Sequence, residues 1–413
     1  LQHMGLEVLD EHPYEFGGAE PFWIYDFGIR GSHPAVAPGE AETRRAGFEA
    51  ALTALWRGQT EDDDFNGLVL NADLTWRQVV VLRAYARYLR QAGIQFSQSY
   101  LQRVLRANPT ITRLLVRLFE SRFDPTLQAG AEERCTAITE ELRGALDEVV
   151  SLDHDRILRS YLALIEATLR TNYFQEKDSE PARAEGRAGV FGLRSEGARN
   201  ERPSDEGENT GLGRPEASAE STVGTVPYLV FKLASERVPV VPAPRPKYEI
   251  WVYSPRLEAV HLRFGAVARG GLRWSERPED FRTEVLGLVK AQEVKNSVIV
   301  PSGAKGGFVC KHLPDPADRD AYQAEVLACY RTFISAMLDV TDNIVGDAVV
   351  PPSGVVRLDG DDPYLVVAAD KGTATFSDVA NEIAIRYGYW LGDAFASGGS
   401  EGYDHKKLSL IHI

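Results

Sequence analysis

Three basic residues in the second half of the chain combine useful chemistry with unusual neighbours. Arg269, Lys295 and Lys305 fall within about forty residues of one another, and Arg269 and Lys305 each stand beside a pair of glycines. Glycine lets the backbone approach a ligand closely and leaves room for a charged side chain next to it. Lys305 also follows an expected buried strand around Val300, and α/β proteins bind ligands at strand ends. This pattern predicts a cleft for a small anionic substrate.

Lys305 has two alternative interpretations. A phosphate-binding loop needs glycine, four residues and then Gly-Lys-Ser/Thr, whereas Lys305 is followed by glycine. Taken alone, Lys305 also fits a solvated lysine in a glycine-rich turn, which is the usual position of a charged loop residue. No dinucleotide fingerprint follows a strand, since neither Gly211-Leu212-Gly213 nor Gly398-Gly399-Ser400 has the required spacing. The nearby Arg269 and Lys295 favour the substrate cleft.

The overall composition excludes several classes of function. The chain has 413 residues and a formal net charge of −14, which would repel nucleic acid and anionic membrane surfaces. Arginines interrupt every long apolar run, so no membrane-spanning helix is expected. Cys135, Cys310 and Cys329 are widely spaced, which predicts free thiols in a reducing cytosol. The acidic run at residues 61–64 lacks the ligand spacing of a calcium loop, and we expect no metal site.

Apolar patterning divides the chain into regions. Alternation before residue 40 predicts two short strands joined by a turn. A 3.6-residue period from about residue 42 to 170 predicts five or six helices, one of them capped by Asp73 or Thr75 and ending at Gly93. Residues 176–224 have almost no large apolar side chains, which predicts a disordered insertion. Beyond residue 226, strands alternate with helices that are expected from Pro278, Ala321 and Asp378, which predicts a sheet covered by helices.

The glycine-flanked basic residues belong to longer stretches with a specific resemblance. The segments ARGGLRWSERPEDF and PSGAKGGFV closely resemble the substrate domain of glutamate dehydrogenases, in particular the large NAD-specific bacterial type. The resemblance continues through residues 365–381 and 390–407, and upstream through GLEVLDEHPYEF and LTWRQVVVLRAYARYLRQ. It implies an α/β substrate domain of the amino-acid-dehydrogenase type at residues 225–407. This domain would be preceded by a helical segment at 41–175 and, at 1–40, by the end of an ACT-like α+β regulatory region.

The resemblance also implies roles for individual residues. Lys305 matches the catalytic lysine of the family, and Asp370, in Ala-Ala-Asp-Lys-Gly, matches the catalytic aspartate. Lys295 matches the lysine that binds the α-carboxylate of the substrate. Arg269, followed by Gly270, stands where small glutamate dehydrogenases carry a lysine that contacts the side-chain carboxylate, and a guanidinium can pair a carboxylate there in a bidentate manner. The implied cofactor is NAD and the implied partners are L-glutamate and 2-oxoglutarate.

The chain is therefore interpreted as part of a cytoplasmic, homo-oligomeric NAD-dependent glutamate dehydrogenase. The family's dinucleotide domain is expected after residue 407, and residues 408–413 do not resemble the family continuation, which suggests foreign sequence. One alternative is an inactive fragment that binds glutamate or assembles with full-length subunits. Another is a dehydrogenase for a different amino acid. Arg269 argues against this last alternative, because a cation opposite an apolar side chain would be left unpaired in a closed cleft.

Overall fold

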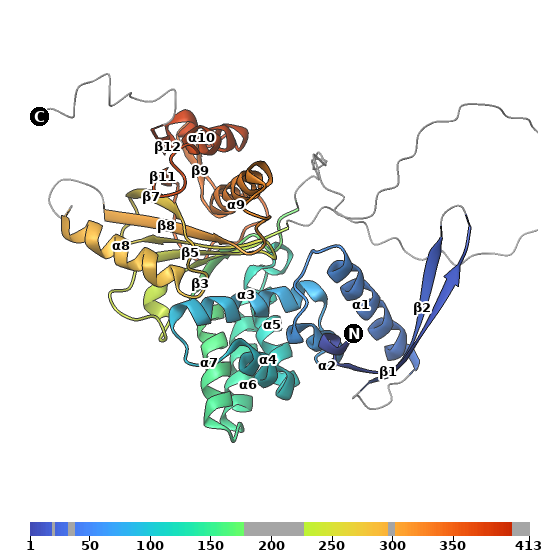
Figure 1. The fold of residues 1–413 in the computed structure, drawn as a ribbon. Coiled ribbons are helices and arrows are strands. Elements are labelled where there is room, and N and C mark those ends of the chain that lie inside the picture. Colours follow the sequence, from blue (N-terminus) through green and yellow to red (C-terminus); the bar gives the residue numbers. More distant parts are fainter. Residues whose placement is uncertain (19–20, 32–37, 177–226, 296–301, 399–413) are drawn as a thin grey trace, which may run out of the picture. The chain divides into compact units, whose positions relative to one another are not determined.

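The computed structural model describes residues 1–18, 21–31, 38–176, 227–295 and 302–398. Figure 1 traces these residues as a ribbon. Three features expected from the sequence lie outside them: residues 177–224 of the expected insertion, the short strand around Val300, and the tail at 408–413.

The N-terminal residues form the expected pair of strands. Strands β1 (Leu6–Phe16) and β2 (Phe22–Gly31) pair antiparallel, with an irregularity between Val8 and Asp10. Phe16 lies opposite Phe22, and their rings stack with centroids 4.9 Å apart. Aromatic and aliphatic side chains on both faces of this hairpin are exposed. Two strands alone are marginally stable in water, so little of the fold's stability comes from this region.

A helical region follows the hairpin. Its helices are α1 (Pro38–Trp56), α2 (Leu68–Asn71), α3 (Trp76–Ala92), α4 (Gln98–Ala107), α5 (Pro109–Phe123), α6 (Ala131–Asp147) and α7 (Leu152–Ala167). Thr75 and Gln78 form a capping box at the start of α3, and Gly93 ends the helix with φ +100°. The expected helix start and end at these residues are confirmed. The expectation that helix continues to residue 170 is wrong, because Thr168–Thr171 form strand β3, which pairs with the next strand of the sheet.

The second half of the chain is built on an eight-stranded mixed sheet in the order β12-β11-β7-β8-β6-β5-β4-β3. Neighbours β12, β11, β7 and β8 run parallel, and the remaining pairs are antiparallel. The strands are β4 (Leu229–Leu233), β5 (Tyr248–Tyr253), β6 (Leu257–Arg263), β7 (Ala268–Trp274), β8 (Ser302–Cys310), β11 (Val366–Ala369) and β12 (Ala396–Ser397). A separate two-stranded pair consists of β9 (Asn343–Val345) and β10 (Ala348–Val350).

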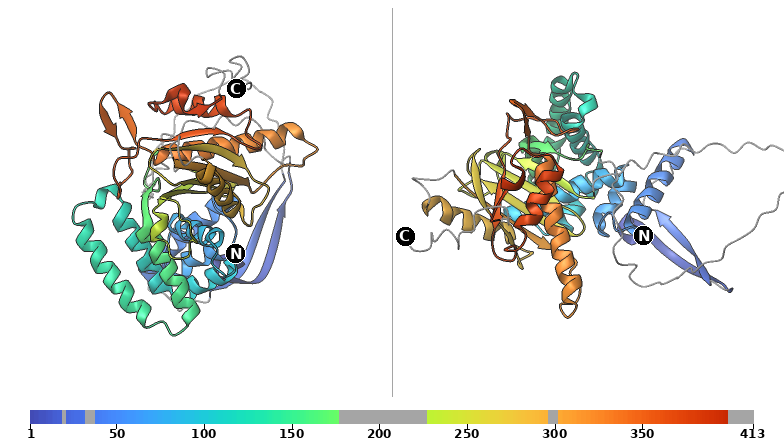
Figure 2. Two further views of the ribbon diagram at one scale, coloured as in Figure 1. Left: turned by 90° about the vertical axis from the view of Figure 1, so that its left-hand side faces the viewer. Right: turned by 90° about the horizontal axis from the view of Figure 1, so that it is seen from above.

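Helices cover both faces of this sheet (Figures 1 and 2). On one face, α3 and α8 (Phe281–Lys295) bury one core, and the Trp251 indole donates to the Ala84 carbonyl at 3.1 Å. On the other face, α9 (Arg319–Asp339) and α10 (Ser377–Arg386) bury a second core with Val252 and Leu272. Successive side chains of a strand point to opposite faces of the sheet, so alternate residues pack into the two cores. The predicted sheet covered by helices is confirmed.

Two glycine-flanked segments that the sequence analysis did not assign to strands form β7 and β8. A Cβ on Gly270 of β7 would lie 1.5 Å from the Ala304 carbonyl oxygen of β8, and a Cβ on Gly306 would lie 2.4 Å from Leu272. These glycines therefore allow β7 and β8 and their neighbours to pack closely. Helix α8 also begins at Phe281 rather than around Pro278. Of the helices in the described part of the chain, none is long and apolar enough to cross a membrane.

Candidate active site

Lys305 lies in the middle of β8, not in a loop after a strand. It pairs with Leu262 of β6, while the neighbouring Gly306 pairs with Leu272 of the parallel strand β7. A Cβ on Gly306 would meet Phe333 of α9, and a Cβ on Gly307 would meet Val285 of α8. Because side chains alternate along a strand, Lys305 faces the α8 side of the sheet. On β7, a Cβ on Gly271 would lie 3.2 Å from the Lys305 Nζ, so this glycine leaves room for the ammonium.

Asp370 follows the last residue of β11 and meets Lys305. The Lys305 Nζ lies 2.8 Å from the Asp370 Oδ2. The turn after β11 fixes this carboxylate, because the Lys371 backbone N–H donates to Oδ1 at 2.7 Å. The Asp370 backbone N–H donates to the Thr373 hydroxyl at 3.0 Å, and that hydroxyl donates to the Leu272 carbonyl of β7 at 2.7 Å. The sheet and the turn therefore hold the two residues that the resemblance paired as catalytic.

Two further charged residues complete this cluster. The Arg273 Nη1 of β7 lies 3.0 Å from the Glu284 Oε1 of α8, and its Nη2 lies 3.4 Å from the Asp370 Oδ1. The Ser275 hydroxyl donates to the other oxygen of Glu284 at 2.6 Å. We call Lys305, Asp370, Arg273 and Glu284 the site cluster. The sequence analysis missed Arg273 and Glu284, although reading residues 268–274 as a strand would have placed Arg273 on the same face as Gly271.

The site cluster is reachable from solvent and electrostatically asymmetric. Its four side chains are between 17% and 20% exposed. Burial raises the pKa of the Asp370 carboxyl, but hydrogen bonds from Lys305 and the Lys371 backbone and the charges of Lys305 and Arg273 outweigh burial and lower it. Burial likewise raises the pKa of Glu284, and its bonds to Ser275 and Arg273 outweigh burial and lower it. Both carboxylates are therefore held in the ionised form.

The structure places the three expected substrate-binding residues differently. Arg269 is exposed on β7, and the alternation of the strand puts it on the same face as Gly271, about 7 Å along the strand. Gly270 is buried and faces the opposite side of the sheet. Lys295 is the last residue of α8, and its side chain lies outside the described residues. The structure thus brings Lys305 and Asp370 together, and Arg269 lies on the same face of the sheet as Lys305.

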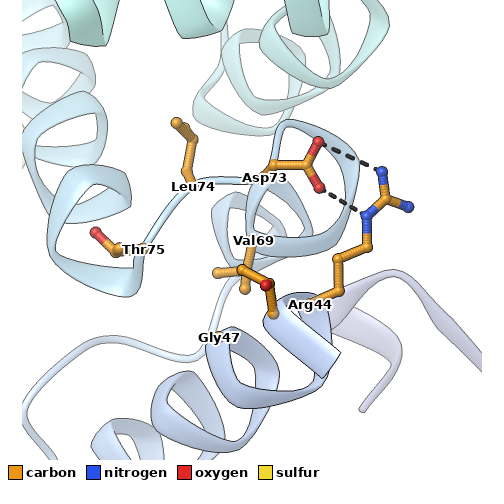
Figure 3. A pocket seen from close by; sticks show the side chains of 7 residues that line it. Arg44, Gly47, Val69, Asp73, Leu74 and Thr75 are labelled. Atoms are coloured by element: carbon orange, nitrogen blue, oxygen red, sulfur yellow. Dashed lines mark hydrogen bonds and ion pairs between the residues drawn. The ribbon is translucent and has the colours of Figure 1, made fainter. Parts of the chain in front are cut away.

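A separate hollow of about 420 Å³ lies in the helical region (Figure 3). Its lining comes from α1 and the segment leading from α2 into α3, and includes Val69, Leu74 and Thr75. Arg44 and Asp73 form an ion pair at its wall, with the Arg44 Nε 2.8 Å from the Asp73 Oδ1. None of the site-cluster residues lines this hollow.

Three family models match parts of the chain. A family model for the bacterial NAD-glutamate dehydrogenase catalytic domain matches residues 141–186 and 216–412. The chain belongs to this family. Models for glutamate dehydrogenase helical motif 3 and for the glutamate dehydrogenase ACT3 domain match residues 60–125 and 1–42. These matches confirm the resemblance seen in the sequence.

Individual relatives carry the same family name. Three relatives are named NAD-specific glutamate dehydrogenase and come from Halomonas elongata, Mycobacterium tuberculosis and Pseudomonas aeruginosa. They are 50%, 51% and 49% identical to this chain, respectively, over alignments that cover 99% of it. The chain spans 23% to 24% of the length of these proteins.

No metal site accompanies the cluster in the part of the chain that the structure describes. No three His, Cys, Asp or Glu side chains there come together in a way that could hold a metal ion.

Proposed function

We propose that the site cluster is the proton-transfer centre of a glutamate dehydrogenase, acting within the full-length protein. The reaction is the oxidative deamination of L-glutamate to 2-oxoglutarate and ammonium, with NAD as the hydride acceptor. The observation that carries the proposal is the 2.8 Å contact between the Lys305 Nζ and Asp370, two residues that the resemblance assigns to catalysis. Membership of the family and the names of the relatives support it.

Each residue of the pair has a distinct task in this reaction. NAD, when bound, would supply the acceptor for the hydride that leaves Cα of glutamate. Asp370 accepts a proton from the substrate amino group, so that an iminium forms, and Lys305 in its neutral form takes a proton from the water that adds to this carbon. Collapse of the adduct returns a proton to nitrogen and releases ammonium and 2-oxoglutarate. Groups placed in this way for general acid–base catalysis typically contribute about 10²–10⁴-fold to the rate.

Substrate binding is assigned to the remaining basic residues. We propose that Arg269 pairs the side-chain carboxylate and Lys295 pairs the α-carboxylate, while Gly270 maintains the close packing of β7 that keeps Arg269 in place. No Gly-x-Gly-x-x-Gly turn follows a strand in this chain, so we assign NAD binding to other parts of the full-length protein. We also propose that the full-length enzyme is a homo-oligomer in the cytoplasm.

The test is to compare Lys305→Ala with Lys371→Ala in the full-length protein. Lys371 is a suitable control because its side chain is 71% exposed and lies 3.9 Å from Glu276, away from the cluster. Lys305→Ala should lower kcat about 10²–10⁴-fold with little change in the KM for NAD, because it removes the base and leaves the nucleotide contacts. Lys371→Ala should behave like the wild type. A Lys305→Ala enzyme with more than about a tenth of wild-type kcat would exclude the base role.

The alternative function, a fragment that binds glutamate without catalysis, is separated by calorimetry. The full-length protein is titrated with glutamate and with NAD, each alone. Binding of both ligands supports an active enzyme, and binding of glutamate alone supports a glutamate-binding role without catalysis.

A further inference from the structure

Arg273 lies at the centre of the site cluster, between two carboxylates from different elements. It contacts Asp370 after β11 with one terminal nitrogen and Glu284 of α8 with the other. Glu284 is fixed in turn by the Ser275 hydroxyl at 2.6 Å. A planar guanidinium with several donors is suited to joining two acceptors in a fixed geometry. These contacts fix the position of the Arg273 guanidinium.

We propose that Arg273 is a positioning residue that keeps Asp370 ionised and in place while Lys305 gains and loses its proton. The inference rests on the proposed function of Lys305 and Asp370. Glu284 sets how much of the Arg273 charge is available to Asp370, because both carboxylates share one guanidinium. Ser275 and Glu284 hold the Arg273 guanidinium in place, so that it does not leave Asp370 to pair with a carboxylate of the substrate.

A permanent cation is needed because Lys305 changes its charge during the reaction. As an ammonium, Lys305 stabilises the Asp370 carboxylate at 2.8 Å. When Lys305 is neutral, ready to take a proton from water, that stabilisation is lost. Arg273 stays protonated throughout the accessible pH range and retains a contact with the other carboxylate oxygen at 3.4 Å. Asp370 therefore stays ionised, able to accept the substrate proton, in both states of Lys305.

Two cations contact Asp370 among the residues that the structure describes. Lys305 approaches from β8 and Arg273 from β7, and Glu284 of α8 lies behind Arg273. On its own turn, Lys371 contributes a backbone N–H, while its side chain lies near Glu276. Changing Arg273 or Glu284 should therefore move the protonation of Asp370 in predictable directions.

The experiment measures kcat/KM for glutamate against pH in the full-length enzyme. Arg273→Met should shift the acidic limb to higher pH by about one unit or more, because losing a cation raises a carboxyl pKa. Glu284→Gln should shift the same limb to lower pH, because Arg273 then serves Asp370 alone. Arg273→Lys should leave the limb near its wild-type position. Arg331→Met is the matched control, since Arg331 of α9 pairs with Glu382 of α10 in a solvent-exposed contact away from the site cluster.

The outcomes separate positioning from a merely structural role. Opposite shifts for Arg273→Met and Glu284→Gln, with the Arg331→Met profile unchanged, support the proposal. Rates lowered by one factor at every pH, with the limb unmoved, overturn it. Circular dichroism reports folding, and if Arg273→Met does not fold, the direction of the Glu284→Gln shift decides. Full activity of both Lys305→Ala and Asp370→Asn would refute the proposed function itself, whatever the Arg273 variants show.

Discussion

The two faces of the eight-stranded sheet each carry a cluster of ion pairs, and the clusters differ in burial. On the α8 face, the side chains of the site cluster are 17% to 20% exposed. On the α9 face, Arg170, Lys232 and Arg263 are at most 2% exposed and pair with aspartates that are at most 7% exposed. We call this second group the buried cluster; its aspartates are Asp342, Asp359 and Asp362.

The same residue types therefore serve different ends in the two clusters. In the buried cluster, Lys232 Nζ contacts Asp362 at 2.6 Å and Arg170 Nη1 contacts Asp342 at 2.8 Å, and solvent does not reach either pair. Such pairs must stay matched, because an unpaired buried charge is costly. In the site cluster, a pair can open towards solvent and substrate at low cost. Burial, more than chemistry, distinguishes a structural cluster from a candidate catalytic one.

The largest predicted difference comes from making the same substitution in both clusters. Asp362→Asn leaves Lys232 and Arg263 short of a negative partner in a closed environment and should lower the free energy of unfolding by about 3–5 kcal/mol. Asp370→Asn should lower it by less than about 1 kcal/mol, because the site is accessible to water. In the full-length enzyme, Asp370→Asn should instead strongly lower kcat. Urea unfolding and steady-state kinetics of both variants provide the measurement.

The comparison fails if the two variants lose stability equally. That result would mean that the site cluster contributes to the fold as the buried cluster does. Retention of wild-type stability by Asp362→Asn would show that the remaining aspartates can reorganise around the two cations.

Much of the fold could be predicted from sequence because its signals are local. Caps and periodicity gave the bounds of α3 to within a residue or two, through Thr75 and Gly93. The strands β7 and β8 were missed because local rules read glycine as a turn former. Their glycines are required by contacts between strands, such as that of Gly270 with Ala304, which sequence spacing does not reveal.

The candidate site was partly predictable for the same reason. Lys305 and Asp370 were identified through long motifs of a known family, although they are 65 residues apart. Arg273 meets Asp370 across 97 residues of sequence, and neither composition nor periodicity predicts that contact. Such partners become visible only when the order of strands in the sheet is known.

A buried histidine beside the buried cluster should give a pH-dependent effect of intermediate size. His261 of β6 is 1% exposed, and both ring nitrogens lack a hydrogen-bond partner among the described residues. Burial, together with the charge of Arg263, lowers its pKa to about 3, against a smaller opposing influence of Asp362. Below about pH 6.5 the unfolded chain takes up a proton that the folded chain does not, so stability falls as the pH falls from 6.5 towards 3.

His261→Leu should remove this dependence. Its free energy of unfolding relative to the wild type should rise steadily as the pH is lowered from 7 to 4.5, as measured by urea titration at each pH. The pKa of Asp362 is held at about 2, below its ordinary value of 3.8, so its stabilising contribution is lost only at a lower pH than this range and does not interfere. His12→Leu is the control, because the His12 side chain is 63% exposed. Parallel pH curves for the His261→Leu variant and the wild type would contradict the prediction.

The smallest predicted effect concerns the Arg44–Asp73 ion pair at the hollow of Figure 3. It adds to the comparison an ion pair that is more exposed to solvent than either cluster. Arg44 and Asp73 have side chains that are 27% and 42% exposed, more than any residue of the other two clusters. Asp73→Asn should change the free energy of unfolding by at most about 1 kcal/mol, because exposed ion pairs contribute little.

Asp73 has φ +52°, a conformation that asparagine adopts readily and alanine does not. Asp73→Ala should therefore cost about 1–2 kcal/mol more than Asp73→Asn. Urea unfolding of both variants separates the ion pair from the backbone. A loss of 3 kcal/mol or more in the asparagine variant, as large as that expected at Asp362, would refute burial as the property that distinguishes these clusters.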